Sequence, residues 1–432
     1  MKKLIKKLFV STLVISNLFF QNSFIAKAED IPEVYSEGAV LMDGTTGKIL
    51  YSKNENTQYE PASTTKIMTA LVVLDNVKDL KEKVTIGEKP PLVDGSAIGI
   101  QEGEVYTVEE LMLGLLLESG NDCAEALAEY VGGSNEGFAK LMNEKAIKLG
   151  ALNTTFKNPS GLHEDGHLTT AYDLALIMKE ASNNEEFIRL ARTESYKYIN
   201  QPFSDGSEKW AINRNQLLNE YSPYFYANAF CGKNGYTPEA NHSYTASATK
   251  DNTLLIGAFL NATDKDSFYS NIGPLFDYGF NNFETVQLIH KGDILDNITI
   301  AEETSIPLLA SEDFYYTIKK GEITPKYTID YKKIDLSEKS ISKGEILFKG
   351  KINVDNTTIG TIDLISGADR VYTPKNSLKT IVSKFSNVSN IFNESKLVII
   401  ISFMVILLIF RQYRVYKIRK RLKKRRYRRR KR

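Results

Sequence analysis

The last 36 residues of the chain constrain its fold more than any other segment. Leu397–Phe410 is a run of fourteen residues, apolar except for Ser402, and fifteen Lys and Arg with no acid follow it from Arg411 to Arg432. As an α-helix the run covers about 21 Å, and flanking apolar residues extend it towards the roughly 30 Å of a bilayer core. A buried core helix is the alternative, but no domain follows to cover it.

Basic residues stay on the cytoplasmic side of a membrane. We therefore expect residues 396–416 to form a single transmembrane helix in the cell membrane. Residues 417–432 would be a cytoplasmic tail, and the folded part of the chain would lie outside the cell.

The first 28 residues predict a secretory signal. Four lysines lie within the first seven residues, Leu8–Phe20 is a short apolar run, and Ala26-Lys27-Ala28 is a small-x-small cleavage site. A retained N-terminal anchor is the alternative, which the short apolar run disfavours.

The chain between these ends is acidic. It carries 35 basic residues against 53 acidic ones, a net charge of −18, which argues against nucleic acid as a partner of the folded part. Cys123 and Cys231 are the only cysteines, too few for a disulfide framework. We expect two buried thiols, with a single bridge as the alternative.

The pattern of apolar and polar residues divides the part of the chain expected outside the cell into two domains. Residues 29–282 combine strand-like runs with helical patterns, and we interpret them as a catalytic domain. Residues 283–375 change to β-branched runs separated by charged turns, which predicts a small β-rich domain. Residues 376–395 are expected to link it to the membrane.

Ser63 and Lys66 are spaced for nucleophilic catalysis. Ser63 opens the helical pattern that runs to Asn76, so Lys66 lies one turn later on the same face. The helix N-terminus offers backbone N–H groups to a developing oxyanion. Two further Ser-x-x-Lys sequences, Ser247–Lys250 and Ser340–Lys343, lie in strand-like or turn-like sequence and do not open a helix.

Three later segments support a catalytic role for the Ser-x-x-Lys sequence at Ser63–Lys66. Ser119-Gly120-Asn121 interrupts a helical region, Asn158-Pro159-Ser160-Gly161-Leu162 forms a loop, and Lys233-Asn234-Gly235 precedes two strands. With these motifs in this order, the chain resembles the serine D,D-carboxypeptidases among the low-molecular-mass penicillin-binding proteins. Their fold is shared with class A β-lactamases, and the resemblance runs from about Glu37 to Tyr372.

The resemblance implies the fold class. It is an α/β (α+β) transpeptidase domain with an antiparallel sheet flanked by helices, followed by a small all-β domain and a C-terminal transmembrane helix.

The resemblance also implies the roles of the residues. Ser63 would be the nucleophile, Lys66 the general base, kept neutral by burial and a second cation, and Ser119 a proton relay to the leaving amine.

Substrate binding would fall to a second group of residues. Asn121 would hold the substrate peptide, Lys233 would add positive charge, and Gly235 would let substrate lie along its strand. The N–H groups of Ser63 and Tyr236 would form the oxyanion hole.

The activity implied is removal of the terminal D-Ala from peptidoglycan stem pentapeptides through an acyl-enzyme, with β-lactams as inhibitors and with no cofactor or metal. Efficient β-lactam hydrolysis is not expected, because the chain contains no Glu-x-x-Leu-Asn element, which carries the deacylating Glu in class A β-lactamases. A D,D-endopeptidase acting on crosslinks and a penicillin-binding sensor or scaffold with impaired catalysis are the alternatives.

Two positions depart from the family pattern. Asn234 stands where the family has Thr or Ser, and Ser267 stands where it often has Arg. Both changes concern recognition of the substrate carboxylate. Our hypothesis is weaker carboxylate binding, or binding through Arg214 or Lys265.

One other motif matches a zinc-binding pattern but is not expected to bind zinc. His163-Glu164-Asp165-Gly166-His167 matches the His-Glu-x-x-His pattern of zinc peptidases, which requires both histidines on one helix face. Pro159, Gly161 and Gly166 predict a loop here, so we do not expect a zinc peptidase.

Overall fold

The computed structural model describes residues 31–251, 253–300, 304–372, 401–414 and 416–417. The predicted signal (1–28) and linker (376–395) lie outside these residues. The structure divides into two compact units. Unit 1 runs to Asp293 and adds Glu312–Thr328 and Ile352–Gly360; unit 2 contains Ile294–Ser311, Ile329–Lys351 and the chain from Thr361 onward.

The centre of unit 1 is a five-stranded sheet with the strand order β2-β1-β11-β10-β9, in which all neighbours are antiparallel. Its strands are β1 (Gly38–Asp43), β2 (Ile49–Lys53), β9 (Ala229–Thr237), β10 (Asn241–Lys250) and β11 (Thr253–Ala262). The first strand of the chain is therefore paired with a strand more than 200 residues later, with Val40 opposite Ala258.

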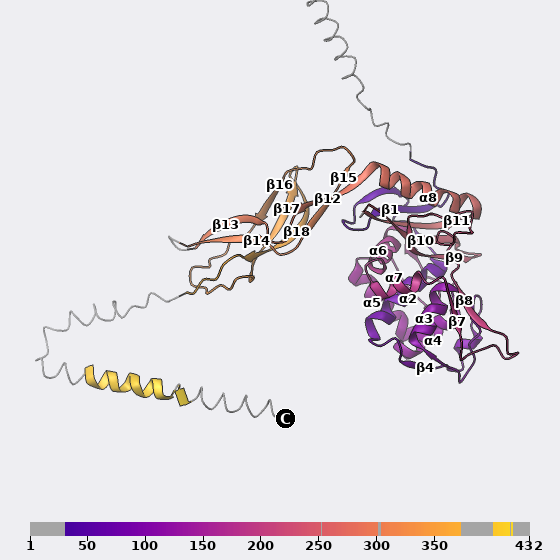
Figure 1. Cartoon of the computed structure of the whole chain (residues 1–432), viewed down its shortest axis with the longest axis horizontal. Helices are drawn as coiled ribbons and strands as arrows, with labels where there is room; N and C mark the ends of the chain where they lie inside the picture. The colour runs from indigo at the N-terminus through magenta and orange to yellow at the C-terminus, as the bar shows by residue number, and fades with distance from the viewer. Residues whose placement is uncertain (1–30, 252, 301–303, 373–400, 415, 418–432) are drawn as a thin grey trace, which may run out of the picture. The chain divides into compact units, whose positions relative to one another are not determined.

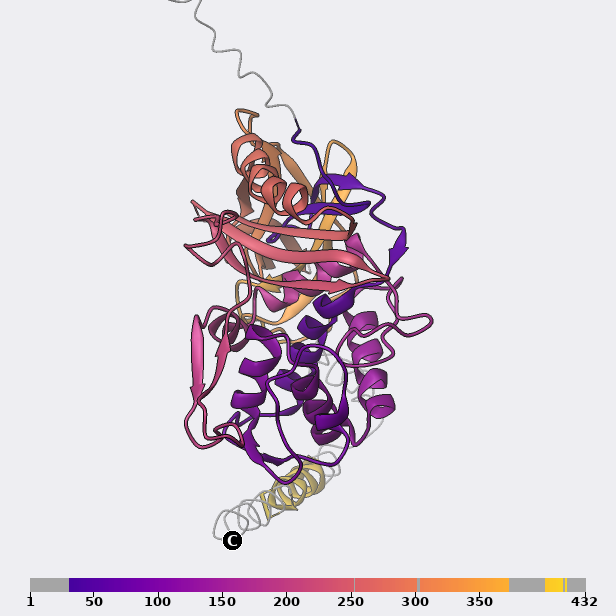
Figure 2. The same cartoon turned by 90° about the vertical axis from the view of Figure 1, so that its right-hand side faces the viewer.

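Helices cover both faces of this sheet (Figure 2). One side carries α8 (Lys265–Asn282), and the other carries a group of six: α2 (Lys66–Asn76), α3 (Val108–Leu117), α4 (Asn121–Gly132), α5 (Asn135–Leu149), α6 (Ala171–Ala181) and α7 (Glu185–Ala191). The alternation along β1 follows from this: Val40 and Met42 belong to the core of the six helices, whereas Leu41 packs in the core beneath α8. The predicted antiparallel sheet flanked by helices is confirmed.

Side-chain caps fix where many of these helices begin. The caps of α3, α5, α6, α7 and α8 each accept a hydrogen bond from a backbone N–H in the first turn, and they are Thr107, Ser134, Thr170, Asn184 and Asp264. Such caps satisfy N–H groups that have no partner within the helix.

Short two-stranded pairs and single 3₁₀ turns complete the helical side of unit 1. The pairs are β3 (Gln58–Tyr59) with β6 (Thr169–Thr170), β4 (Lys83–Thr85) with β5 (Val105–Thr107), and β7 (Ser195–Tyr198) with β8 (Lys209–Ile212). The 3₁₀ turns are η1 (Ala62–Thr65) and η2 (Pro90–Leu92).

A buried carboxylate connects a further β-ribbon of unit 1 to β1. The ribbon pairs β12 (Phe283–Ile289) with β15 (Phe314–Lys319). Asp43, at the end of β1, accepts hydrogen bonds from the hydroxyls of Thr285 (2.5 Å) and Thr317 (2.7 Å). A buried carboxylate is stable only when its acceptors are satisfied, so these bonds hold the ribbon to the end of β1.

The β-rich region also contains a five-stranded sheet with the order β13-β14-β18-β17-β16 (Figure 1). Its strands are β13 (Ile294–Ile300), β14 (Thr304–Ala310), β16 (Tyr327–Tyr331), β17 (Ile346–Val354) and β18 (Thr357–Ser366). The predicted all-β character after residue 283 is confirmed.

No helix in the described parts of the chain combines the length and the apolar composition that a membrane crossing requires. The predicted span, residues 396–416, lies partly outside those parts, and its residues 401–414 are helical with exposed side chains.

Candidate active site

Ser63 lies on the short turn η1, immediately before α2, and is half-buried. The residue before it, Ala62, has a φ of +48°, a left-handed conformation that costs an L-residue free energy. The carbonyl of Pro61 accepts hydrogen bonds from the hydroxyls of Thr64 and Ser243, both at 2.7 Å. These bonds hold the strained turn so that Ser63 faces a cavity.

Lys66 is fully buried and its Nζ contacts three oxygen atoms. They are Ser63 Oγ at 2.9 Å, Asn121 Oδ1 at 2.7 Å and the carbonyl oxygen of Ser160 at 2.6 Å. Because the amide N–H of Asn121 donates to the carbonyl of Asp94, its Oδ1 is the atom that faces Lys66.

This arrangement aims the lone pair of a neutral amine at Ser63. A neutral amine has two N–H bonds, and the oxygens of Asn121 and Ser160 can only accept. When both N–H bonds go to these oxygens, the lone pair is left for the hydroxyl hydrogen of Ser63.

The environment favours the neutral amine. Burial lowers the pKa of Lys66 well below its usual range, and the positive charge of Lys233 lowers it further. Lys233 is itself buried, on β9, and burial lowers its pKa to about 7, against the opposing effect of Glu118.

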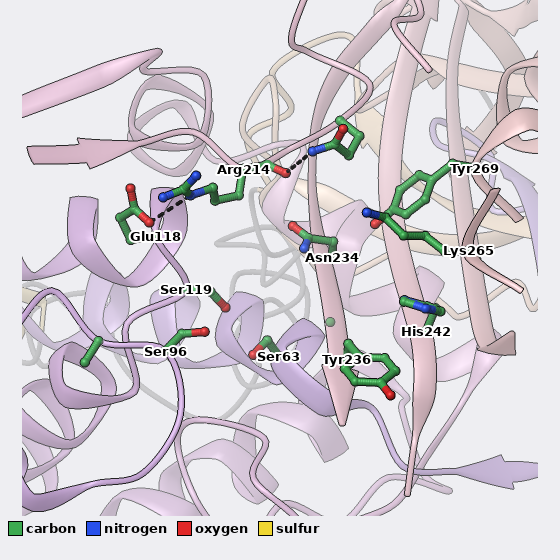
Figure 3. A pocket seen from close by; sticks show the side chains of 13 residues that line it. Ser63, Ser96, Glu118, Ser119, Arg214, Asn234, Tyr236, His242, Lys265 and Tyr269 are labelled. Carbon is green, nitrogen blue, oxygen red and sulfur yellow. Dashed lines mark hydrogen bonds and ion pairs between the residues drawn. The ribbon is translucent and has the colours of Figure 1, made fainter. Parts of the chain in front are cut away.

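Ser119 lies at the break between α3 and α4. Its φ of +62° is again left-handed, and the strained bend turns the side chain towards the cavity that Ser63 also lines (Figure 3). A serine in this conformation is uncommon, and such strain persists where the surrounding structure imposes it.

Gly235 is required by the close approach of β9 to the turn that carries Ser63. A Cβ on Gly235 would lie 2.7 Å from Ser63 N, 2.6 Å from Ser243 Oγ and 3.0 Å from the Cβ of Ala62. This glycine was expected to let substrate lie along the strand; the structure gives it a second reason, contact with the turn η1 that carries Ser63.

The loop 158–161 supports Lys66 from the other side. The side-chain oxygen of Asn158 accepts from the backbone N–H groups of Ser160 and Gly161, which directs the Ser160 carbonyl at Lys66. The Asn-Pro-Ser-Gly sequence predicted a loop, but nothing local in it indicated a contact with the lysine.

His167 is buried and contacts the turn η1. Its Nδ1 accepts from the backbone N–H of Lys157 (3.4 Å), so Nε2 carries the proton and donates to Thr65 Oγ1 at 3.0 Å. Burial lowers the pKa of His167 to about 4. His163 is exposed and contacts Glu60 instead, and the His-Glu-x-x-His sequence lies in a loop, so its two histidines do not share a helix face.

The cavity has a volume of about 590 Å³. Its lining combines hydroxyls, cations and aromatic side chains (Figure 3), and consists of Ser63, Ser96, Ala97, Glu118, Ser119, Arg214, Gln216, Asn234, Gly235, Tyr236, His242, Lys265 and Tyr269. Asn121 and Lys233 are buried and are not among the lining residues.

The two cations on the cavity wall differ in their partners. Arg214 Nε is 2.9 Å from Glu118 Oε2. Lys265, the first residue of α8, has no ion pair or hydrogen bond among the described residues for its amine. Ser267 does not line the cavity, and its backbone N–H is bound by Asp264.

Several lining residues were missed from sequence. Ser96, Glu118, Gln216, His242 and Tyr269 come from separate segments with no motif of their own. Glu118 could have been noticed, since it directly precedes Ser119 and ends a helix.

The comparisons with known proteins agree with this geometry. Residues 25–264 match the family model described as D-alanyl-D-alanine carboxypeptidase, and residues 283–372 match the C-terminal domain of penicillin-binding protein 5. The chain is 34% identical over 358 residues to the D-alanyl-D-alanine carboxypeptidase DacF of Bacillus subtilis (strain 168), covering 80% of this chain and 89% of the relative.

Two further similarities cover most of the chain. DacC of Escherichia coli (strain K12), also a D-alanyl-D-alanine carboxypeptidase, is 34% identical over 324 residues, which are 71% of this chain and 77% of the relative. The crystal structure of penicillin binding protein 5 from Haemophilus influenzae aligns with a TM-score of 0.65 and 27% identity, over 78% of this chain and 98% of that one.

The family model spans more than half of the chain, and the residues it covers include the buried lysine in contact with an accessible serine. Both lines of evidence lead to the same conclusion: the chain belongs to the serine-type D-alanyl-D-alanine carboxypeptidase family.

Proposed function

We propose that Ser63 is the nucleophile and Lys66 the general base of this carboxypeptidase. The observation that carries the proposal is the 2.9 Å contact between Lys66 Nζ and Ser63 Oγ, made by an amine whose pKa burial lowers. Lys66 takes the hydroxyl proton as Oγ attacks the carbonyl carbon of the penultimate D-Ala.

The oxyanion formed by this attack would be bound by the backbone N–H groups of Ser63 and Tyr236. These residues lie on η1 and β9, which Gly235 brings into contact. When the C–N bond breaks, the terminal D-Ala leaves as an amine that has gained the proton from Lys66 through Ser119. Water then hydrolyses the Ser63 ester and restores the hydroxyl.

Asn121 remains a proposed substrate-binding residue with a second task. Its Oδ1 is bound to Lys66 and its amide N–H to Asp94. Its positioning of Lys66 is therefore the better supported of the two roles.

We assign the substrate carboxylate to Lys265 and Asn234. Both line the cavity together with Ser63. Among the described residues Lys265 has no anionic partner, whereas the charge of Arg214 is shared with Glu118. An exposed cation without such a partner is the better site for a new carboxylate. The Asn234 amide can add a hydrogen bond.

Substitutions on the cavity wall test this assignment. Lys265→Gln should raise KM for a D-Ala-D-Ala pentapeptide about tenfold with a smaller change in kcat, and Arg214→Gln should raise KM less. Equal effects of the two substitutions on KM would contradict the assignment. So would a wild-type KM in the range usual for such carboxypeptidases, if Asn234→Thr also left KM unchanged.

The catalytic proposal has a direct test. Intact-protein mass spectrometry after penicillin exposure should show one covalent adduct on the wild type and none on Ser63→Ala. Release of D-alanine from a pentapeptide separates the remaining cases: a sensor labels but releases nothing, and an endopeptidase prefers crosslinked peptides.

Secretion and membrane attachment through residues 396–416 remain proposals that rest on the sequence alone. The support is the apolar run followed by fifteen basic residues. Cell fractionation should find the full chain in the membrane and a chain ending at residue 395 outside it; equal distribution would contradict the anchor.

A further inference from the structure

Three metal-ligating side chains meet outside the cavity that Ser63 lines. Glu60, His163 and Glu239 come from three separate segments, and their ligand atoms all lie within 4.8 Å of one another. His163 Nδ1 is 2.8 Å from Glu60 Oε1. None of the three lines the cavity or takes part in the contacts of Lys66.

The cluster has an excess of negative charge. Within the part of the chain that the structure describes, Glu239 forms no ion pair or hydrogen bond through its carboxylate, and Glu60 binds only His163. No Lys or Arg among the described residues pairs with either glutamate, so a cation would relieve repulsion here.

The donor set selects among cations. One imidazole nitrogen and two carboxylate oxygens are ligands that Zn²⁺ takes in tetrahedral sites at about 2.0–2.2 Å, with water in the fourth position. Ligands on one tetrahedral ion lie about 3.3 Å apart, so groups now within 4.8 Å need only small side-chain rotations, which the exposure of His163 and Glu239 allows. Mg²⁺ prefers oxygen ligands in an octahedron and would gain little from the imidazole.

We propose that Glu60, His163 and Glu239 form a Zn²⁺ site outside the cavity that Ser63 lines, separate from the catalytic groups. Glu60 precedes Ser63 by three residues, His163 follows the loop that supports Lys66, and Glu239 lies in the turn between β9 and β10. A bound ion would therefore tie together the three segments that surround the nucleophile turn.

The test uses the full chain, without an affinity tag and freed of metal with a chelator, titrated with ZnCl₂ by calorimetry. The wild type should bind one Zn²⁺, and at about 100 times Kd its Tm should rise by about 5 °C or more. His163→Ala and Glu239→Gln should each weaken binding at least about tenfold. Mg²⁺ at the same concentration should produce neither effect.

A matched control is available in the same chain. His290 is also exposed and pairs with a carboxylate, Asp293 at 3.5 Å, but belongs to no three-ligand group among the described residues. His290→Ala should leave Zn²⁺ binding unchanged. The proposal fails if the wild type shows no saturable binding, if His163→Ala and His290→Ala titrate alike, or if Mg²⁺ binds as tightly. Unchanged metal-free Tm values in the variants show that lost binding is not misfolding.

Discussion

The substitution Gly161→Ala should disable the support of Lys66 without touching a catalytic group. Gly161 has a φ of +82°, and a Cβ there would lie 1.9 Å from the carbonyl oxygen of Ala62 and 2.8 Å from Thr65 Oγ1. The Ala62 oxygen belongs to the backbone of the turn η1, which carries Ser63, and cannot rotate away. The loop must therefore move, and the Ser160 carbonyl moves with it.

The loss of stability expected for Gly161→Ala has two parts. A left-handed Ala costs about 1–2 kcal/mol, partly offset by the lower entropy of the unfolded chain. Forcing a methyl group into packed atoms adds roughly 1–3 kcal/mol. We expect a total loss of about 2–4 kcal/mol of stability. Displacing the Ser160 carbonyl by about 1 Å should slow acylation on the order of 10²-fold.

Gly103→Ala separates the two parts. Gly103 has a φ of +81°, almost equal to that of Gly161, but its Cβ would meet no atom within 4 Å. This variant should show only the backbone cost and a normal acylation rate. The assays are thermal unfolding and the rate of labelling by a fluorescent penicillin. If the two variants acylate at the same rate, the loop does not position Lys66.

Two further predictions concern charge. Lys233→Gln removes a positive charge that lowers the pKa of Lys66. The rise of the acylation rate with pH should therefore occur at higher pH in this variant. If the rise between pH 5 and 10 does not move, the two amines are not coupled. His167 has its pKa lowered from 6.5 to about 4, so the unfolded chain binds more protons between these values. The free energy of unfolding of the wild type, measured by urea unfolding at each pH, should therefore fall by on the order of 3 kcal/mol as the pH drops from 6.5 to 4. His167→Gln should lack this contribution to the pH dependence. Equal slopes in both proteins would refute it.

Local patterns predicted most of the elements around the site. The helical pattern after Ser63 became η1 and α2, and the break at Ser119 separates α3 from α4. These features follow from periodicity and turn chemistry, which act over a few residues. Elements with weak patterns were missed, among them α7 and the strands β7, β8, β14 and β16, because tertiary packing rather than local preference stabilises them.

The sequence by itself determined the chemistry: a serine and a lysine one turn apart, a second serine, a second lysine, and the order of their motifs. Only the tertiary structure decided which groups control that lysine. Asn121, the Ser160 carbonyl and Lys233 are distant from Lys66 in sequence and influence it because α4 and the loop 158–161 contact α2 and β9 contacts η1. The pKa of an amine depends on burial and on charges in space, and no pattern of neighbouring residues encodes either.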